Sequence, residues 1–577
     1  MLEGGSPMNQ NMMPRFFLVV AFLFLVFAFP QAALGRSYFN DTFGMNNPSQ
    51  EMELIDGEDL AGLNIGWISD GVARSKIEYE EDGEVKYDWT SLNEMLNVYV
   101  DMLDMHLWLV VNPVTAIKTS GAKKYKKGKF LPIKDEAMDL YTAYLKALVS
   151  YTKHYKPGFR VSYWSVYNEP HGTYFSIFGK TDEGIDKAAK AYVRLVKKTY
   201  KIIRTRDPGA RVVLGGVGSA AGPKGYQFYH KVLERLDELD PKRENNGYFD
   251  FFDYHDYNYF DKYKTNRRGY GYNWFRREVL KPYGFFGKVI VIKEGATHTG
   301  KDLDANGRLD IYQSESDQAE YAIKRAVFNH GKSVRNVQWS TLREHGLFQG
   351  SYHVNFCYNG FIFNGSPTGD EEWFDPVKHI ADPKIIITQE PSEPDLYTFT
   401  TAIFREGTGW DYKTSVRTWE ELEGALSPEQ QDELLATGSL EIGDGIKKLA
   451  YYTYKFMVDK LRDCDLRQMD TLRRNDEDDS LYLYEFWHTD GTPIYVAWWD
   501  WFKEPGVVDK TTTFHLNLPT PNSQVRIINA IPTAESGADA EIFLEQYPDF
   551  FSTATALAVG NQVVVTLDRI PVYIEPL

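Results

Sequence analysis

The sequence predicts an α/β protein, a (β/α)8 (TIM) barrel followed by a C-terminal antiparallel β-sandwich. Eight short apolar or aromatic runs alternate with helical patterns over roughly 300 residues, which is the pattern of such a barrel. Two of these runs end in a glutamate. From Ser480 onward, apolar residues instead recur at every second position, which is typical of antiparallel strands.

The barrel elements follow from these runs and from the apolar periodicity between them. The expected strands are residues 38–44, 63–68, 107–111, 163–167, 211–214, 249–255, 288–293 and 334–340. Helical spacing of apolar residues predicts helices over 89–105, 135–155, 187–206, 226–239, 274–280 and 314–330. Ser314 and Asp317 predict a capping box at the start of the last of these helices.

The chain of 577 residues is long enough for two or three domains. Residues 1–35 are expected to form a signal peptide with an N-terminal extension, and 36–364 the catalytic barrel. A polar insertion with a small helical unit covers 365–445, and 446–464 provide the closing barrel helix. The β-sandwich covers 465–577, with a hairpin turn at Asp490-Gly491.

The N-terminal segment has the pattern of a secretory signal. Arg15 precedes an apolar run from Phe16 to Phe29, and small residues follow up to Gly35. Fourteen apolar residues are short for a spanning helix, so a secreted, periplasmic or extracellular protein is expected, with an uncleaved signal anchor as the alternative. The net charge of −17 argues against a nucleic-acid partner. Cys357 and Cys464 allow either one disulfide or two thiols.

The stretch VSYWSVYNEPHG, residues 161–172, carries the first candidate for chemistry. Its aromatic and β-branched half predicts a buried strand, and Pro170 cannot continue the strand's hydrogen bonding. Glu169 is therefore expected in the loops at the C-terminal edge of the barrel, where such proteins keep their active sites.

A second strand, 288–293, ends in the same way at Glu294 and breaks at Gly295. If both strands belong to one barrel, Glu169 and Glu294 face the same pocket. Taken alone, either glutamate is better interpreted as a strand-end residue that pairs with Lys or Arg, and only the two together favour chemistry. Two carboxylates across a cleft are what glycoside hydrolysis requires, since one protonates the leaving oxygen and the other attacks or activates water.

With Asn168-Glu169-Pro170 on the fourth strand and Ile292-Lys293-Glu294-Gly295 on the seventh, the sequence resembles the clan A glycoside hydrolases, and most of all the family 39 (β-xylosidase) group. The resemblance covers residues 38–364 and 446–577. It implies a retaining O-glycosidase acting on oligo- or polysaccharides, with Glu169 as acid/base and Glu294 as nucleophile. It also implies substrate-binding residues: Asn168 on the sugar 2-hydroxyl, His255, Tyr257, which should orient Glu294, and Trp339.

The acid is expected to be the less solvated of the two carboxyl groups, because it must hold its proton near neutral pH. Two departures from the family pattern are noted. Ser69 stands where an arginine is common at the end of the second strand, with Arg74 the nearest candidate, and Gly295 replaces an aromatic residue. They motivate the competing hypothesis of a non-catalytic secreted glycan-binding protein.

Catalysis is expected to need no cofactor. Asp302, Asp304, Asn306 and Asp310 match oxygen-ligand positions of a calcium loop, but its twelfth position is Gln313 rather than a glutamate. The segment is therefore either a structural calcium site or a solvated turn.

The loop after the third strand, residues 118–129, contains six lysines and no acid. Loops after barrel strands line the active-site mouth. The loop is either simply solvated or a positive rim that attracts an anionic, sulfated or uronic glycan by charge steering.

Overall fold

We describe the protein from a computed structural model. It describes residues 43–46, 57–218, 221–265, 269–302, 311–344, 358–364, 383–405, 409–464, 470–474, 480–501, 510–521, 523–539, 542–543, 547 and 549–577. The predicted signal segment and Cys357 lie outside these ranges. Among the described helices, none combines the length and apolar character needed to span a membrane.

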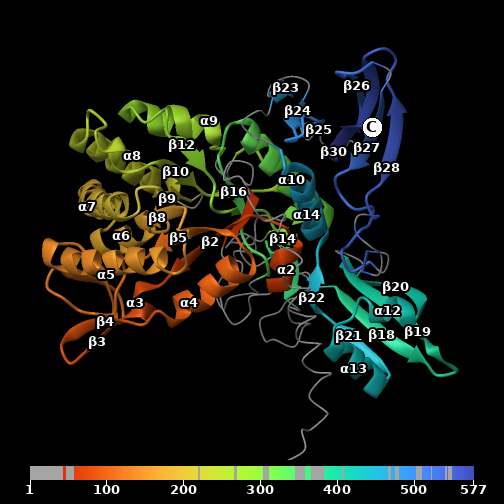
Figure 1. The fold of residues 1–577 in the computed structure, drawn as a ribbon, viewed down its shortest axis with the longest axis horizontal. Coiled ribbons are helices and arrows are strands. Elements are labelled where there is room, and N and C mark those ends of the chain that lie inside the picture. The colour runs from red at the N-terminus through yellow and green to blue at the C-terminus, as the bar shows by residue number, and fades with distance from the viewer. Residues whose placement is uncertain are drawn as a thin grey trace, which may run out of the picture.

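Eight parallel strands form the barrel, on the left of Figure 1, as the sequence predicted. Neighbouring strands pair in chain order, and a parallel bridge between Ile292 and Val337 joins the seventh to the eighth. The strands are β1 (Phe43–Asn46), β2 (Trp67–Val72), β5 (His106–Val111), β8 (Tyr163–Val166), β9 (Arg211–Val217), β10 (Phe251–Tyr254), β12 (Val289–Val291) and β16 (Val337–Trp339).

Helices follow the strands and cover the outside of the barrel (Figure 1). The capping box of α10 is present, since Ser314 and Asp317 bond each other's backbone N–H groups. The barrel helices are α2 (Gly57–Gly62), α4 (Thr90–Leu96), α5 (Asp135–Lys153), α6 (Pro170–Phe178), α7 (Asp182–Arg206), α8 (Gly222–Leu239), α9 (Tyr272–Trp274), α10 (Glu315–Gly331) and α14 (Leu449–Leu461).

Alternation along the strands divides the barrel interior into an apolar floor and a polar top. Large buried side chains fill the floor. Two residues further along, polar side chains such as Ser165 and Asp253 follow and are fully buried. The floor consists of Trp67, Trp108, Tyr163, Val213, Phe251 and Val291. The polar groups are therefore concentrated at the C-terminal edge, where the two glutamates lie.

Three strands continue past their predicted ends. The first was expected to end at residue 44, but β1 ends at Asn46. The second strand was expected to end at Ile68, but β2 runs from Trp67 to Val72, which places Ser69 inside the strand. The fifth was expected to turn at Gly215-Gly216, but β9 continues to Val217. Glycine was taken as a turn signal there, whereas in this barrel it makes room for neighbouring side chains.

Residues 365–445, expected as a mainly polar insertion, contain an antiparallel sheet in the order β20-β19-β18-β21, at the lower right of Figure 1. The helical unit expected around 419–436 is present as α12 (Trp419–Glu423) and α13 (Pro428–Thr437). The long strands that hold it were not predicted. They are β18 (Lys384–Glu390), β19 (Glu393–Arg405), β20 (Gly409–Thr418) and β21 (Ser439–Ile442).

The C-terminal part forms two antiparallel sheets, as expected, with an apolar core between them. This sandwich packs directly on the barrel: Phe456 of α14 stacks on Phe551 at 4.0 Å, and Tyr263 bonds Trp498. Cys464 is buried and forms no disulfide. The strands are β23 (Asp470–Arg474), β24 (Leu481–Trp487), β25 (Pro493–Trp499), β26 (Thr512–Asn517), β27 (Gln524–Asn529), β28 (Thr553–Leu557), β29 (Gln562–Leu567) and β30 (Val572–Pro576).

Candidate active site

Glu169 lies at the C-terminal end of the fourth barrel strand, where the backbone turns sharply into a helix. Tyr167 has φ 68° and Glu169 has φ 40°, both in the left-handed region that non-glycine residues rarely occupy. Glu169 is the N-cap of α6, and Pro170 is the first residue of that helix. Such backbone strain is often found at functional sites. Here it holds the Glu169 carboxylate at the mouth of the barrel.

Glu294 lies three residues after β12, across the barrel mouth from Glu169. One carboxylate oxygen of each glutamate lies within 4.8 Å of the other. The sequence prediction that strands four and seven bring the two glutamates together therefore agrees with their placement.

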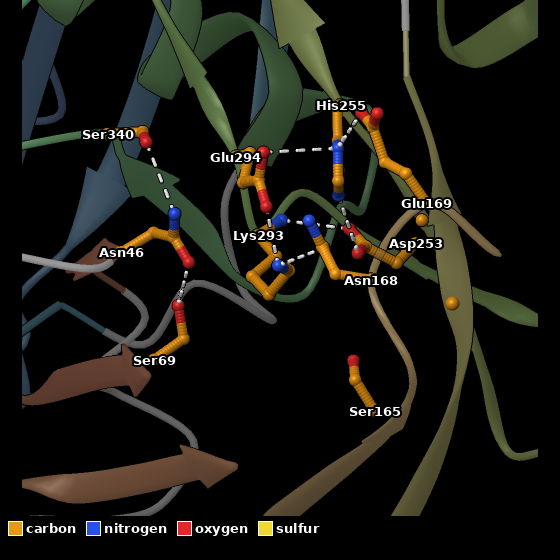
Figure 2. Close-up of polar contacts among 12 residues, drawn as sticks. Asn46, Ser69, Ser165, Asn168, Glu169, Asp253, His255, Lys293, Glu294 and Ser340 are labelled. Atoms are coloured by element: carbon orange, nitrogen blue, oxygen red, sulfur yellow. Dashed lines mark hydrogen bonds and ion pairs between the residues drawn. The ribbon is translucent and has the colours of Figure 1, made fainter. Parts of the chain in front are cut away.

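His255 bridges the two glutamates (Figure 2). Its Nδ1 lies 2.7 Å from Glu169 Oε1 and 3.2 Å from Glu294 Oε2. Its Nε2 lies 3.2 Å from Asp253 Oδ2, and the His255 and Asp253 side chains are both fully buried. The ring therefore faces a carboxylate on each side and, in its protonated form, donates a hydrogen bond from each nitrogen.

The charges in this cluster shift its protonation equilibria strongly. Burial disfavours an imidazolium, but the carboxylates of Glu294 and Asp253 outweigh it and raise the pKa of His255 to about 10. Burial also disfavours the Glu294 carboxylate, but His255 and Lys293 outweigh it and lower the pKa of Glu294 to about 2. At neutral pH the site therefore holds an imidazolium next to an ionised Glu294.

Lys293 places a second positive charge beside Glu294. Its Nζ lies 2.6 Å from Glu294 Oε1 and 2.6 Å from Asn168 Oδ1. The lysine backbone N–H donates to Asp253 Oδ1 at 2.9 Å. The residues that precede the two glutamates are thus joined to each other across the site (Figure 2).

A chain of hydrogen-bonding groups supports Glu294 from the other side. The Tyr257 hydroxyl lies 3.3 Å from Glu294 Oε2, as expected for a residue that orients it, and 3.0 Å from Ser340 Oγ. The Asn46 amide donates to Ser340 at 3.2 Å, and Ser69 donates to Asn46 at 2.7 Å. Ser69 therefore belongs to this chain.

The expectation about solvation was wrong. The Glu169 side chain is 34% exposed, whereas that of Glu294 is 13% exposed. The reason is positional, because Glu169 stands at the N-terminus of α6 at the rim of the barrel, whereas Glu294 is enclosed by Lys293, His255 and Tyr257. Glu169 is thus the carboxyl group more open to solvent.

Two glycines, Gly216 on β9 and Gly218 just after it, make room for the site. A Cβ at Gly216 would collide with the His255 ring, and a Cβ at Gly218 would collide with the Glu169 carboxylate. The short segment Gly215-Gly216-Val217-Gly218 thus lets β9 lie close behind the catalytic candidates. The sequence predicted a turn at Gly215-Gly216 and did not single out Gly218.

The two departures from the family pattern have structural explanations. Arg74 does not reach the site, since it is buried, pairs with Glu78 at 2.8 Å and donates to the Pro113 carbonyl. A Cβ at Gly295 would collide with the Arg325 guanidinium and with the Asp256 carbonyl oxygen. Glycine is therefore the residue that fits behind Glu294.

Trp339 lies at the end of β16 with a fully buried ring. Its Nε1 donates to the Asn359 carbonyl at 2.9 Å, and the ring stacks on Phe361 at 4.7 Å. The structure thus places Trp339 in the core beside the site. A contact with substrate stays a prediction for Trp339, as it does for the buried His255.

Glu169, His255 and Glu294 are close enough to share a metal ion. Protein groups already occupy these atoms, since His255 Nδ1 lies 2.7 Å from Glu169 Oε1 and the Lys293 ammonium donates to Glu294 Oε1 at 2.6 Å. In the predicted calcium loop, Asp304, Asn306 and Asp310 lie outside the described residues, as does the side chain of Asp302. Gln313, at the twelfth position, is buried and donates to Thr297 and His298, so protein groups already occupy its amide.

Sequence reasoning missed four residues of the site: Lys293, Asp253, Asn46 and Ser340. Lys293 carried the clearest signal, as a lysine directly before a strand-end glutamate. The other three are small polar residues on or beside barrel strands, and nothing in one sequence marks them as neighbours.

Comparison with known proteins supports the same fold. No family model matches this sequence, and no curated protein matches it. Among solved structures, the chain is similar to a family 39 glycoside hydrolase from the gut symbiont Bacteroides cellulosilyticus WH2. The TM-score is 0.53 at 12% identity, over 94% of this chain and 82% of that one. This chain shares the fold of that family 39 glycoside hydrolase.

Two further structures align with lower scores. A family 39 β-xylosidase from Caulobacter crescentus has a TM-score of 0.46 at 15% identity, covering 94% of this chain and 97% of that one. A family 51 arabinofuranosidase from Xanthomonas axonopodis pv. citri has a TM-score of 0.44 at 10% identity, covering 93% and 96%. At these identities the likeness concerns the fold alone.

Proposed function

We propose that this protein is a retaining glycoside hydrolase that cleaves O-glycosidic bonds in oligo- or polysaccharides by double displacement. The observation that carries the proposal is the approach of Glu169 and Glu294 to within 4.8 Å at the barrel mouth. Retaining enzymes hold their carboxyl groups about 5–5.5 Å apart, whereas inverting enzymes leave roughly 6.5–9.5 Å for a water molecule. The short separation favours direct attack by a carboxylate.

In the first step, Glu294 attacks the anomeric carbon and Glu169 gives its proton to the glycosidic oxygen. The bond to the leaving group breaks, and an ester between the sugar and Glu294 forms. The low pKa of Glu294, about 2, suits a group that must be ionised at neutral pH. Glu169, whose side chain is more exposed to solvent, exchanges protons with the leaving group and with water.

In the second step, Glu169 takes a proton from water, whose oxygen attacks the anomeric carbon. The ester bond breaks, and Glu294 returns to its ionised form. His255 contacts both glutamates and so keeps their carboxylates in position through both steps. Asn168, next to Glu169, is assigned to the sugar 2-hydroxyl.

An anionic glycan is the substrate class that the lysine-rich loop favours. The loop forms a hairpin of β6 (Ala122–Lys126) and β7 (Lys129–Pro132), and Lys123 Nζ lies 4.9 Å from the ring of Phe178 at the end of α6. Because α6 begins directly after Glu169, the hairpin lies near the acid/base side of the site. In the described part of the chain, no carboxylate pairs with any lysine of residues 118–129. Their charge is therefore available to an anionic ligand.

The proposal includes secretion, because the N-terminal segment has the pattern of a signal peptide. The protein would then act on glycans outside the cytoplasm. A structural calcium ion in residues 302–313 remains part of the proposal without a catalytic role.

Azide rescue tests the two roles separately. Glu169→Gln and Glu294→Gln are each expected to lower kcat by more than about 10²-fold, the lower range for a positioned acid or base. With an activated aryl glycoside and azide, Glu294→Gln should give the glycosyl azide of inverted configuration, since azide takes the place of the nucleophile. Glu169→Gln should give the azide of retained configuration, since azide then replaces the deprotonated water.

A non-catalytic glycan-binding protein is the competing hypothesis. A panel of aryl glycosides and neutral and anionic polysaccharides distinguishes the two, because the competing protein would bind without releasing sugar. If release by the Glu294→Gln variant equals that of the unmodified protein, Glu294 is not the nucleophile. Both carboxylates are present and close together, which favours the enzyme.

A further inference from the structure

Lys293 contacts a residue on each side of the site, Glu294 and Asn168. Its side chain is 2% exposed, and its ammonium lies 2.6 Å from both Glu294 and Asn168. The backbone of the same residue is held by Asp253. A lysine anchored at its backbone and bonded twice at its Nζ has little freedom to leave the site.

The contact with Asn168 determines which way that amide points. A lysine ammonium only donates hydrogen bonds, so the Asn168 atom that faces it must be the oxygen. The NH2 group therefore points away from Lys293. No residue in the described ranges accepts a hydrogen bond from it, so this donor is available to a ligand.

Charged groups surround Lys293 from several barrel strands. Glu294 follows it on the seventh strand, and Asp253 and His255 come from the sixth. Glu169 lies across the site after the fourth. On the second strand Asp70 is buried and bonded to Tyr99, and its burial raises its pKa to about 6. Lys293 and His255 are thus the two cations among four carboxyl groups.

We infer that Lys293 is a positioning residue with two roles. It keeps Glu294 ionised, and it turns Asn168 so that the amide NH2 donates to the 2-hydroxyl oxygen of the bound sugar. The inference rests on the proposed function for its second role, whereas its first role is a property of the free protein. Sugars without a 2-hydroxyl should then be poor substrates.

Kinetics of Lys293→Gln and Lys293→Arg test both roles. Loss of an adjacent positive charge should move the acid limb of the kcat/KM–pH profile upward by about 1–3 pH units in Lys293→Gln. Lys293→Arg should keep the limb in place. The preference for a 2-hydroxy over a 2-deoxy aryl glycoside should fall about tenfold in Lys293→Gln, the worth of one hydrogen bond.

Lys288→Gln is the matched control. Lys288 is also buried and lies just before the same strand, but its Nζ donates to the carbonyls of Asn246 and Phe249, away from the site. This variant should keep both the acid limb and the substrate preference. If Lys293→Gln also keeps both, the inference is wrong.

Thermal unfolding gives a readout that needs no activity. The difference in Tm between the unmodified protein and Lys293→Gln should grow as pH rises from 3.5 to 5.5, a window chosen below the titration of Asp70, because Glu294 ionises without its ammonium partner in the variant. A difference that stays constant across this window overturns the first role. If no glycoside is cleaved, the proposed function and the second role fail, while this measurement still decides the first.

Discussion

His255 Nδ1 lies 2.7 Å from Glu169 Oε1, while its other ring nitrogen faces the buried carboxylate of Asp253 at 3.2 Å. The imidazolium therefore contacts a carboxylate of the site through one ring nitrogen and a carboxylate of the barrel interior through the other. The protonation of His255 therefore depends on all three carboxylates that surround it, those of Glu169, Glu294 and Asp253.

His255→Gln should change how stability depends on pH. Because the pKa of His255 rises from an ordinary 6.5 to about 10, the folded protein binds this proton more tightly than the unfolded chain does. The stabilisation is complete below pH 6.5 and is lost as pH rises to about 10. The Tm difference between the unmodified protein and the variant should therefore be larger at pH 6 than at pH 10.

His330→Gln is the control for this measurement. His330 is also buried, but burial lowers its pKa to about 4, so it is neutral throughout the range above pH 6.5. Its Tm difference should not vary between about pH 7.5 and 10, where the histidine is neutral in both the folded and the unfolded chain. An equal pH dependence in the two variants would contradict the bridging role of His255.

Tyr257→Phe should weaken catalysis without unfolding the protein. Removing a hydroxyl that bonds an ionised carboxylate costs about 1.5–3 kcal/mol, or roughly 10- to 100-fold in kcat/KM. The measurement is steady-state kinetics beside Tyr254→Phe, whose hydroxyl bonds Asn329 on the outer side of the barrel sheet. Equal kinetics in the two variants would show that Tyr257 does not orient Glu294.

Gly295→Ala should destabilise the protein through a steric conflict behind Glu294. The added Cβ would meet the Arg325 guanidinium and the Asp256 carbonyl, and overpacking of this kind typically costs about 1–3 kcal/mol. Gly287→Ala is the matched control, since no atom lies within 4 Å of a Cβ built there. The Tm of each variant measures this loss of stability. An unchanged Tm of Gly295→Ala would mean that Arg325 and Asp256 can move away from the added Cβ.

The lysine hairpin should make turnover of an anionic glycan depend on salt. Exposed charges are screened over a Debye length of about 8 Å at physiological ionic strength, so kcat/KM should fall steeply as salt is added. Replacing four lysines of the hairpin together by serine should remove this dependence. These are Lys123, Lys124, Lys126 and Lys127.

A second quadruple variant controls for net charge. It replaces four exposed lysines elsewhere on the barrel, Lys146, Lys190, Lys201 and Lys242. This variant should keep the salt dependence of the unmodified protein. A neutral preferred substrate, or turnover that ignores salt, would leave the hairpin without a role in recognition.

The barrel and its two glutamates were predictable from the sequence because both depend on local patterns. Apolar runs that end at Asn168-Glu169-Pro170 and at Glu294-Gly295 predict buried strands and their ends directly. The closure of eight parallel strands then brings the ends of strands four and seven to one mouth. The β-sandwich was predictable for the same reason, since its strands alternate regularly.

The environment of the glutamates was decided by tertiary structure alone. Which carboxyl group is more exposed depends on the groups packed around it, and Lys293, His255 and Tyr257 enclose Glu294 rather than Glu169. Asp253 was part of a predicted strand, but its contacts with His255 and Lys293 depend on how strands six and seven pair. Gly215-Gly216 was expected to form a turn, whereas Gly216 lies directly behind the His255 ring and Gly218 directly behind the Glu169 carboxylate.

The sequence by itself therefore determined which residues stand at the strand ends, because strand periodicity and its interruption by proline or glycine are local properties. Only the tertiary structure decided the charge of those residues. Protonation depends on distances of a few ångströms between groups far apart in the chain, such as Asn168 and Lys293, and those distances exist only once the barrel has closed.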